Sequence, residues 1–243
     1  MALYCYLKAQ PKIMPQPVTR PAPKTAEVAR PRNLARYLPA LFFVAGLIFL
    51  TNAFLPIAIY ELKSQNFSQA LISPVEVLGE NNTVVDYSQP RSWFPTAPEF
   101  APKLSNITAY NISIPKLKIN QAVVKIGGED LLKSLAQYPG TAIPGQYGNA
   151  VIFGHSVLPQ FFNPKDYRTI FSTLPTLKEG DEILVNFDGI EYRYQVIKMV
   201  EVPPDDVSVL EQRYDREYLS LVTCVPPGTY LRRLVVRAKL VRL

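Results

Sequence analysis

Residues 218–241 read YLSLVTCVPPGTYLRRLVVRAKLV, two apolar runs of strand length joined by a loop with two prolines and a glycine. Runs rich in β-branched residues and bounded by turn residues predict β-strands. Similar runs lie upstream, from about residue 111, and they are NISIPKL, QAVVKIG, NAVIFG, DEILVNF and EYRYQVIKMVEV. Asp188-Gly189, between the last two, is a strong hairpin signal. Two stretches, EDLLKSLAQY (129–138) and roughly DYRTIFSTL (166–174), are predicted to be helices. Many short strands with few helices indicate an all-β barrel or sandwich.

An apolar segment, Tyr37 to Tyr60, precedes this β-rich region and contains 24 residues without a charge. As a helix it rises about 36 Å at about 1.5 Å per residue, which spans a hydrocarbon core of about 30 Å. Residues 1–36 hold seven basic side chains and one acid, so they carry the whole net charge of +6. This charge predicts a cytoplasmic N-terminus. A cleaved signal peptide is the alternative, but its apolar core is usually only about 7–15 residues long.

These patterns divide the chain into four segments. They are a basic, proline-rich cytoplasmic tail (1–36), a transmembrane signal anchor (37–60), an extracytoplasmic stalk (61–110) and a β-rich domain (111–243). Bulky apolar residues in RSWFPTAPEF make this part of the stalk a candidate lid. Because the positive charge lies in the tail, the composition is weak support for a nucleic-acid-binding domain.

The β-rich domain contains one cysteine, Cys224, and the only histidine of the chain, His155. The other cysteine, Cys5, lies on the opposite side of the predicted anchor and cannot pair with Cys224. An unpaired thiol is unusual where cysteines mostly form disulfides, although a buried apolar cysteine is the structural alternative. His155 follows a strand-like run and is the single candidate for acid–base chemistry by an imidazole.

Strand alternation assigns faces to the residues around Cys224. Ser220, Val222 and Cys224 share one face, and Leu219, Leu221 and Thr223 share the other. After the loop, the even positions from Leu234 onward are apolar and are predicted to face the core, so Arg233 and Val235 face outward. Arg232 occupies an even position and would face the core, where burying an unpaired guanidinium costs much free energy. Parity therefore favours Arg233 as the functional arginine unless a β-bulge intervenes.

The run SLVTC (220–224), followed eight residues later by RRLVVR, resembles the sortase active-site signature. That signature is a Thr-Leu-x-Thr-Cys strand, a variable loop and a strand opened by an essential arginine. The upstream run AVIFGHS resembles the segment that carries the sortase histidine. Ser220 departs from the usual threonine. The resemblance covers about residues 111–243, and an N-terminal anchor also suits this family.

The resemblance implies a closed β-barrel of about eight strands with short helices, and a substrate groove on the outer face. It also implies a cysteine transpeptidase with catalytic His155, Cys224 and Arg233. Residues expected to contact the substrate are Val222, Thr223 and Val235. The implied reaction cleaves a Leu-Pro-x-Thr-Gly-like sorting motif through a thioacyl-enzyme.

The expected partners are surface proteins with a C-terminal sorting motif, an amine acceptor on peptidoglycan or a pilin lysine, and the membrane. No metal, cofactor or nucleic acid is expected. Two rival interpretations remain. L,D-transpeptidases also pair cysteine with histidine, but there the histidine lies a few residues before the cysteine, whereas 69 residues separate the two here. The second rival interpretation is a non-enzymatic, single-pass surface β-domain that binds a partner.

Overall fold

The computed structural model describes residues 37–64, 68–69, 88–93 and 107–241 of the 243-residue chain. Helix α1 (Leu38–Ser64) is the one helix among these residues that is long and apolar enough to cross a membrane. Its 27 residues rise about 40 Å at about 1.5 Å per residue, more than a hydrocarbon core of about 30 Å requires. Helix α1 ends at Ser64, whereas the apolar segment predicted from the sequence ends at Tyr60.

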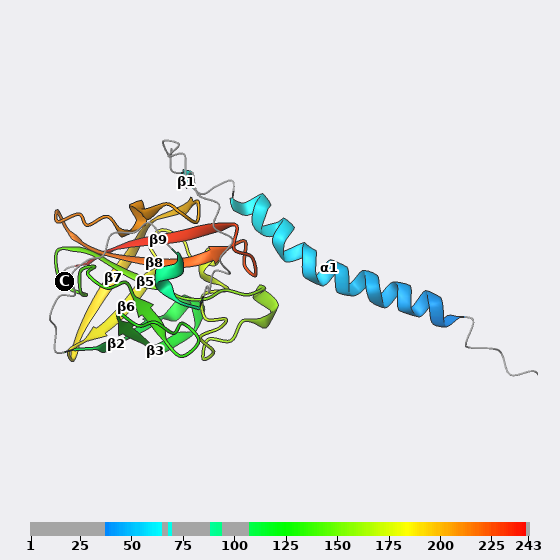
Figure 1. The fold of residues 1–243 in the computed structure, drawn as a ribbon, viewed down its shortest axis with the longest axis horizontal. Helices are drawn as coiled ribbons and strands as arrows, with labels where there is room; N and C mark the ends of the chain where they lie inside the picture. The colour runs from blue at the N-terminus through cyan, green and yellow to red at the C-terminus, as the bar shows by residue number, and fades with distance from the viewer. Residues whose placement is uncertain (1–36, 65–67, 70–87, 94–106, 242–243) are drawn as a thin grey trace, which may run out of the picture. The chain divides into compact units, whose positions relative to one another are not determined.

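Eight strands close into a barrel (Figure 1). They are β2 (Ala109–Ile114), β3 (Ile119–Ile126), β4 (Leu135–Gln137), β5 (Gly148–Phe153), β6 (Glu182–Phe187), β7 (Ile190–Val202), β8 (Glu217–Val225) and β9 (Arg232–Leu240). Their order is β7-β6-β2-β3-β4-β5-β8-β9, and β9 pairs again with β7. A two-residue strand, β1 (Ser68–Gln69), pairs in parallel with β7. The predicted all-β barrel is confirmed.

Short 3-10 helices occupy several of the connections. They are η2 (Pro90–Trp93), η3 (Pro115–Leu117), η4 (Pro159–Phe161), η5 (Leu174–Thr176) and η6 (Val207–Leu210). The predicted hairpin joins β6 to β7, and Asp188 and Gly189 have φ angles of 53° and 74°. Two successive positive φ angles are what a tight two-residue hairpin turn requires.

Two buried clusters lie on opposite faces of the strands. The barrel interior contains Ile112, Val124, Ile152, Val196, Leu221 and Val236, among others. A second group, here called the outer cluster, comprises Trp93, Leu131, Ala136, Tyr138, Val151, Phe153, Val202, Val209, Leu210, Val222, Cys224 and Val235. Leu221 and Val222 thus belong to different clusters, as strand alternation predicts. Cys224 lies outside the barrel but is covered.

Two predicted helices are wrong. Within residues 129–138, Leu135–Gln137 forms β4, which fills the gap between β3 and β5. Pairing on both sides outweighs the helical propensity of a run this short. Residues 166–174 form successive turns, and the amide of Phe171 donates to the carbonyl of His155 at 3.0 Å instead of to a carbonyl one helical turn earlier. Pro175, which has no amide hydrogen to donate, lies in the first turn of the short helix η5, where a helix tolerates it.

Candidate active site

The parallel pairing of β5 with β8 brings the segment that carries His155 to the end of β8 that carries Cys224. Phe153 lies opposite Val222 in this ladder, so the residues two positions further along, His155 and Cys224, follow the same register. The alignment continues past the end of β5, where the amide of Gly154 donates to the carbonyl of Val222 at 3.2 Å. Backbone pairing therefore joins two residues that are distant in sequence.

A side chain on each strand extends this connection. The Thr223 hydroxyl donates to the carbonyl of Gly154 at 2.8 Å, and the Ser156 hydroxyl donates to the carbonyl of Cys224 at 2.6 Å. These bonds flank His155 on both sides in the sequence. They hold the segment that carries the imidazole against the end of β8.

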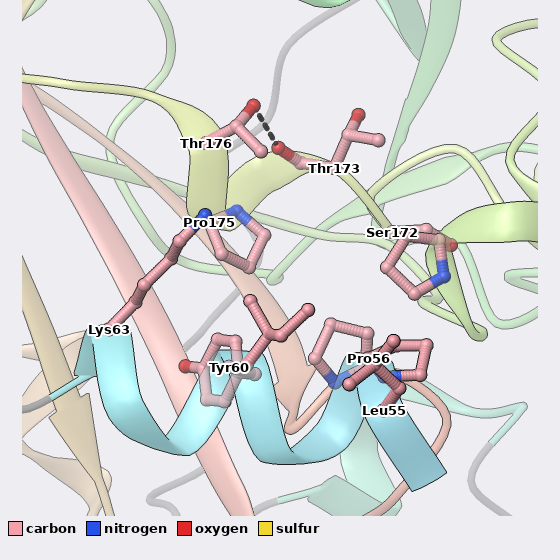
Figure 2. Close-up of a pocket in the computed structure, with 11 residues that line it drawn as sticks. Leu55, Pro56, Tyr60, Lys63, Ser172, Thr173, Pro175 and Thr176 are labelled. Carbon is pink, nitrogen blue, oxygen red and sulfur yellow. Dashed lines mark hydrogen bonds between the residues drawn. The ribbon is translucent and has the colours of Figure 1, made fainter. Parts of the chain in front are cut away.

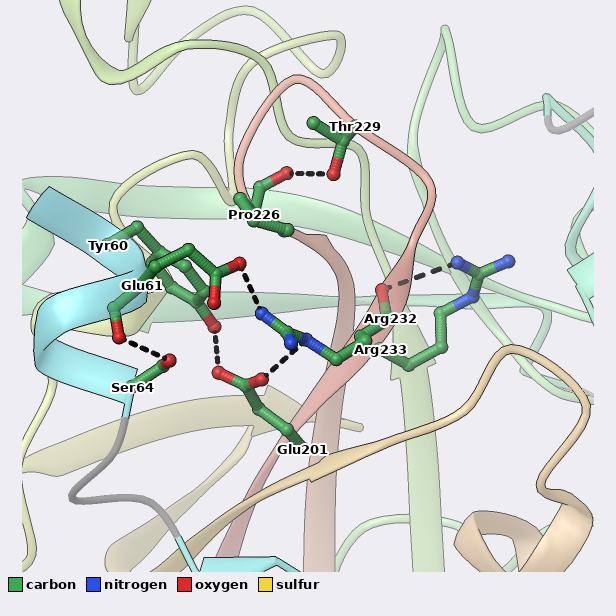
Figure 3. A network of polar contacts seen from close by, with 8 residues as sticks. All are labelled: Tyr60, Glu61, Ser64, Glu201, Pro226, Thr229, Arg232 and Arg233. Atoms are coloured by element: carbon green, nitrogen blue, oxygen red, sulfur yellow. Dashed lines mark hydrogen bonds and ion pairs between the residues drawn. The ribbon is translucent and has the colours of Figure 1, made fainter. Parts of the chain in front are cut away.

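On the other side of Cys224, β9 supplies the arginine. Cys224 lies opposite Arg233, and Val225 lies opposite Arg232, with regular pairing from Tyr218 to Val225. No bulge interrupts this ladder, so the two arginines point to opposite faces (Figure 3). Arg233 is 1% exposed, and its Nη1 donates to the carbonyl of Tyr230 at 3.1 Å. The structure brings Arg233, and not Arg232, to the face of Cys224.

Trp93 covers this face. It comes from η2 and is 1% exposed. Its ring centroid lies 5.0 Å from the Arg233 guanidinium carbon, 5.5 Å from the Phe153 ring and 6.1 Å from the His155 ring. A guanidinium at this distance makes a cation–π contact. Trp93 therefore lies between the two polar residues that flank the cysteine.

The sequence contained a signal for this cover, since Trp93 belongs to the candidate lid RSWFPTAPEF. The structure describes this segment only as far as Trp93, and residues 94–100 lie outside the described residues. Just before this segment, the carbonyl of Ser88 accepts a hydrogen bond from the amide of Leu131 at 3.0 Å. What the sequence did not identify was that Trp93 and Phe153 would contact each other beside the catalytic candidates.

Burial controls the charge state of the cysteine. Cys224 is 1% exposed, and this desolvation raises its pKa to about 11, while the Arg233 guanidinium lowers it. Burial dominates because a thiolate loses its hydration in an apolar cluster. In this arrangement the thiol is protonated at neutral pH, and the Arg233 guanidinium favours the thiolate because it lowers this pKa.

The three residues predicted to contact substrate have different surroundings. Val222 and Val235 belong to the outer cluster together with Cys224, and they lie opposite each other on β8 and β9. Thr223 is fully buried, and its hydroxyl is bonded to Gly154. The two valines therefore share the face of the cysteine, whereas Thr223 connects β8 to the segment that carries His155.

Comparison with known proteins identifies the family. Residues 112–241, more than half of the chain, match the family model of the sortase domain. The chain belongs to the sortase family. Sortases are cysteine transpeptidases, and the closed barrel is the sortase fold.

Two curated sortases are similar to this one. Sortase A of Bacillus anthracis is 32% identical over 131 residues, which cover 54% of this chain and 58% of that protein. Sortase D of Bacillus subtilis (strain 168) is 28% identical over 116 residues, which cover 47% and 53%. The chain thus spans little more than half the length of these relatives. A solved structure of sortase A from Corynebacterium diphtheriae, a lid mutant, is 29% identical, with a TM-score of 0.49 over 58% of this chain and 74% of that one.

Proposed function

We propose that this sortase is a membrane-anchored cysteine transpeptidase that cleaves a Leu-Pro-x-Thr-Gly-like sorting motif. It transfers the acyl group to an amine of the cell wall or of a pilin lysine. The observation that carries the proposal is the position of Cys224 between the segment of His155 and the guanidinium-bearing strand of Arg233. A nucleophile, an acid–base group and a cation on one surface are the parts that acyl transfer needs.

In the first half of the reaction, the Cys224 thiol gives its proton to His155, and the sulfur attacks the carbonyl carbon of the threonine in the motif. Arg233 donates hydrogen bonds to the oxyanion that forms on that carbonyl. His155 gives a proton to the leaving amine as the peptide bond breaks. The products are a thioester on Cys224 and a released peptide with a free amino group.

In the second half, the incoming amine attacks the thioester and His155 accepts its proton. The tetrahedral intermediate collapses to a new amide bond, and the Cys224 sulfur leaves and is reprotonated. Val222 and Val235 line the surface on which the motif binds, and Trp93 moves away before the motif reaches the thiol. Thr223 is also proposed to contact the substrate.

The proposed topology places residues 1–36 in the cytoplasm and the barrel outside the membrane, because the basic residues precede the apolar helix. Protease added to intact cells should then degrade the barrel and leave the N-terminal tail protected. Protection of both parts would contradict this orientation. The partners that follow are surface proteins with a C-terminal sorting motif.

The test of the reaction incubates the full chain in detergent with fluorescent sorting-motif peptides and an amine acceptor. Mass spectrometry should find a thioester on Cys224 and a transpeptidation product. Cys224→Ala should abolish both, and Cys5→Ala, which changes the only other cysteine, should leave both unchanged. If no peptide of the panel acylates Cys224, the enzyme proposal fails and a non-enzymatic binding domain is favoured.

A further inference from the structure

A second group of polar side chains lies one residue from the active site. The Arg232 Nε lies 2.8 Å from a carboxylate oxygen of Glu201, and the Arg232 Nη2 donates to Glu61. The Tyr60 hydroxyl donates to the other carboxylate oxygen of Glu201 (Figure 3). We call these four residues the docking cluster. Tyr60 and Glu61 belong to the last turns of α1, Glu201 to β7 and Arg232 to β9.

Burial distinguishes this cluster from ordinary surface ion pairs. The Glu201 side chain is only 8% exposed, and Tyr60 is 6% exposed. A carboxylate in such a position is tolerated only when its oxygens are hydrogen-bonded or paired, and here each oxygen has a partner. Both partners depend on α1, one directly through Tyr60 and the other through the contact of Arg232 with Glu61.

Two further features lie between this end of α1 and the barrel. A side-chain amide of Gln160 donates to the carbonyl of Asn52 at 3.0 Å. Beside it, a mostly apolar cavity of about 290 Å³ separates α1 residues such as Pro56 and Lys63 from the stretch Ser172–Thr176 (Figure 2). An open cavity forgoes the dispersion contacts that close packing would provide. Tyr60 also packs in the buried core of the barrel, so both apolar packing and the polar contacts of the docking cluster hold this end of α1.

The cluster is connected to the active site through two consecutive residues. Arg232 and Arg233 begin β9, where they pair with Val225 and Cys224. The residues just before them, 226–231, form a loop without strand pairing. The Arg233 Nη1 also lies 3.4 Å from the carbonyl of Arg232, which accepts a hydrogen bond from it. A shift of the Arg232 backbone would therefore move the guanidinium beside Cys224.

We propose that the last turns of α1 dock on the barrel through the docking cluster, and that this docking positions Arg233 beside Cys224. Glu201 and Tyr60 are positioning residues, since they act on Arg233 through Arg232. The helix that anchors the protein is thus part of the catalytic unit. The expected effect of docking on the reaction rate rests on the proposed function, whereas the position of Arg233 can be measured without any reaction.

Glu201→Gln tests the proposal, because it keeps the size of the side chain and removes the charge that pairs with Arg232. Tyr60→Phe is the milder second variant and removes one hydroxyl. In the full chain in detergent micelles, Glu201→Gln should lower kcat about tenfold with little change in KM, since sub-ångström misplacement of a catalytic group costs this much. Tyr60→Phe should lower kcat less, and Arg193→Gln is the matched control. Arg193 also lies on β7 and pairs with Glu182 at 3.6 Å, where both side chains are more than 40% exposed.

A spectroscopic measurement separates this proposal from the proposed function. Trp93 is the only tryptophan of the chain, and it contacts Arg233. Its emission should move to longer wavelength in Glu201→Gln and Tyr60→Phe, but not in Arg193→Gln, because a displaced guanidinium admits water to the ring. If the wild type does not acylate, the emission still tests the docking. Unchanged emission in both variants, or an equal change in Arg193→Gln, overturns the proposal.

Discussion

Cys224 and Arg233 face each other across the β8–β9 ladder, and both are 1% exposed. A cation so close to a buried thiol has a clear electrostatic role, because it opposes the desolvation that raises the pKa of Cys224. Since Arg233 also contacts Trp93 at 5.0 Å, the cover and the catalytic candidates form one connected group. The predictions below test separate parts of this arrangement.

Arg233→Gln should lower kcat/KM by about 10²–10³, the usual loss when an oxyanion donor is removed. Arg233→Lys should recover part of this loss because it restores the charge but not the planar fork of donors. Steady-state kinetics with a sorting-motif peptide would measure both variants. Equal activity of Arg233→Gln and the wild type would remove Arg233 from the mechanism.

Trp93→Ala should accelerate alkylation of Cys224. Uncovering the thiol returns its pKa from about 11 toward its ordinary value of 9.0 or below, because water then solvates the thiolate while Arg233 remains nearby. The pH dependence of the iodoacetamide reaction would show the midpoint moving to lower pH. Tyr214→Ala removes an aromatic ring that is 66% exposed and serves as the control. An unchanged alkylation profile in Trp93→Ala would mean that Trp93 does not limit access to the thiol.

The stability of the protein should depend on Cys224 at alkaline pH. The pKa of this thiol is raised from 9.0 to about 11 in the folded protein. The neutral thiol therefore stabilises the fold fully below pH 9, and this contribution is lost as pH rises toward 11. The loss is about 2–3 kcal/mol, since one pKa unit corresponds to about 1.4 kcal/mol.

The measurement for this prediction is urea unfolding of the wild type and of Cys224→Ala between pH 7 and pH 11. Tyrosines and lysines that titrate in this range affect both proteins equally. The difference between the two free energies of unfolding should therefore shrink as pH rises. A difference that stays constant with pH would show that burial does not perturb this thiol.

Thr223→Val should destabilise the protein by about 1–3 kcal/mol, because the carbonyl of Gly154 loses its buried donor. Thr223→Ser keeps the hydroxyl and should retain most of the stability. The same two variants test the predicted substrate contact, which would raise KM in Thr223→Val. A lower kcat with unchanged KM would instead assign Thr223 to the positioning of His155.

Local sequence patterns were sufficient to predict most of the strands and the faces on which the side chains of β8 and β9 lie. Alternation placed Val222 and Cys224 on one face and Leu221 on the other because side chains on a strand have a period of two. The same reasoning failed at residues 129–138, where β4 has only three residues. A segment this short carries no periodic signal, and its strand state comes from the neighbours that pair with it.

By itself, the sequence determined the apolar helix, the strand-rich domain, the solitary thiol and histidine, and the resemblance that connects them. These features are local, or they depend on residue identity and spacing alone. Only the tertiary structure decided that Trp93 packs in one buried cluster with Cys224. It alone also decided that Arg232 is held by Glu201 and Glu61. The Arg232–Glu201 pair depends on the pairing of β7 with β9, which closes the barrel, and the other contacts depend on η2 and α1, which pack against the barrel from distant parts of the sequence.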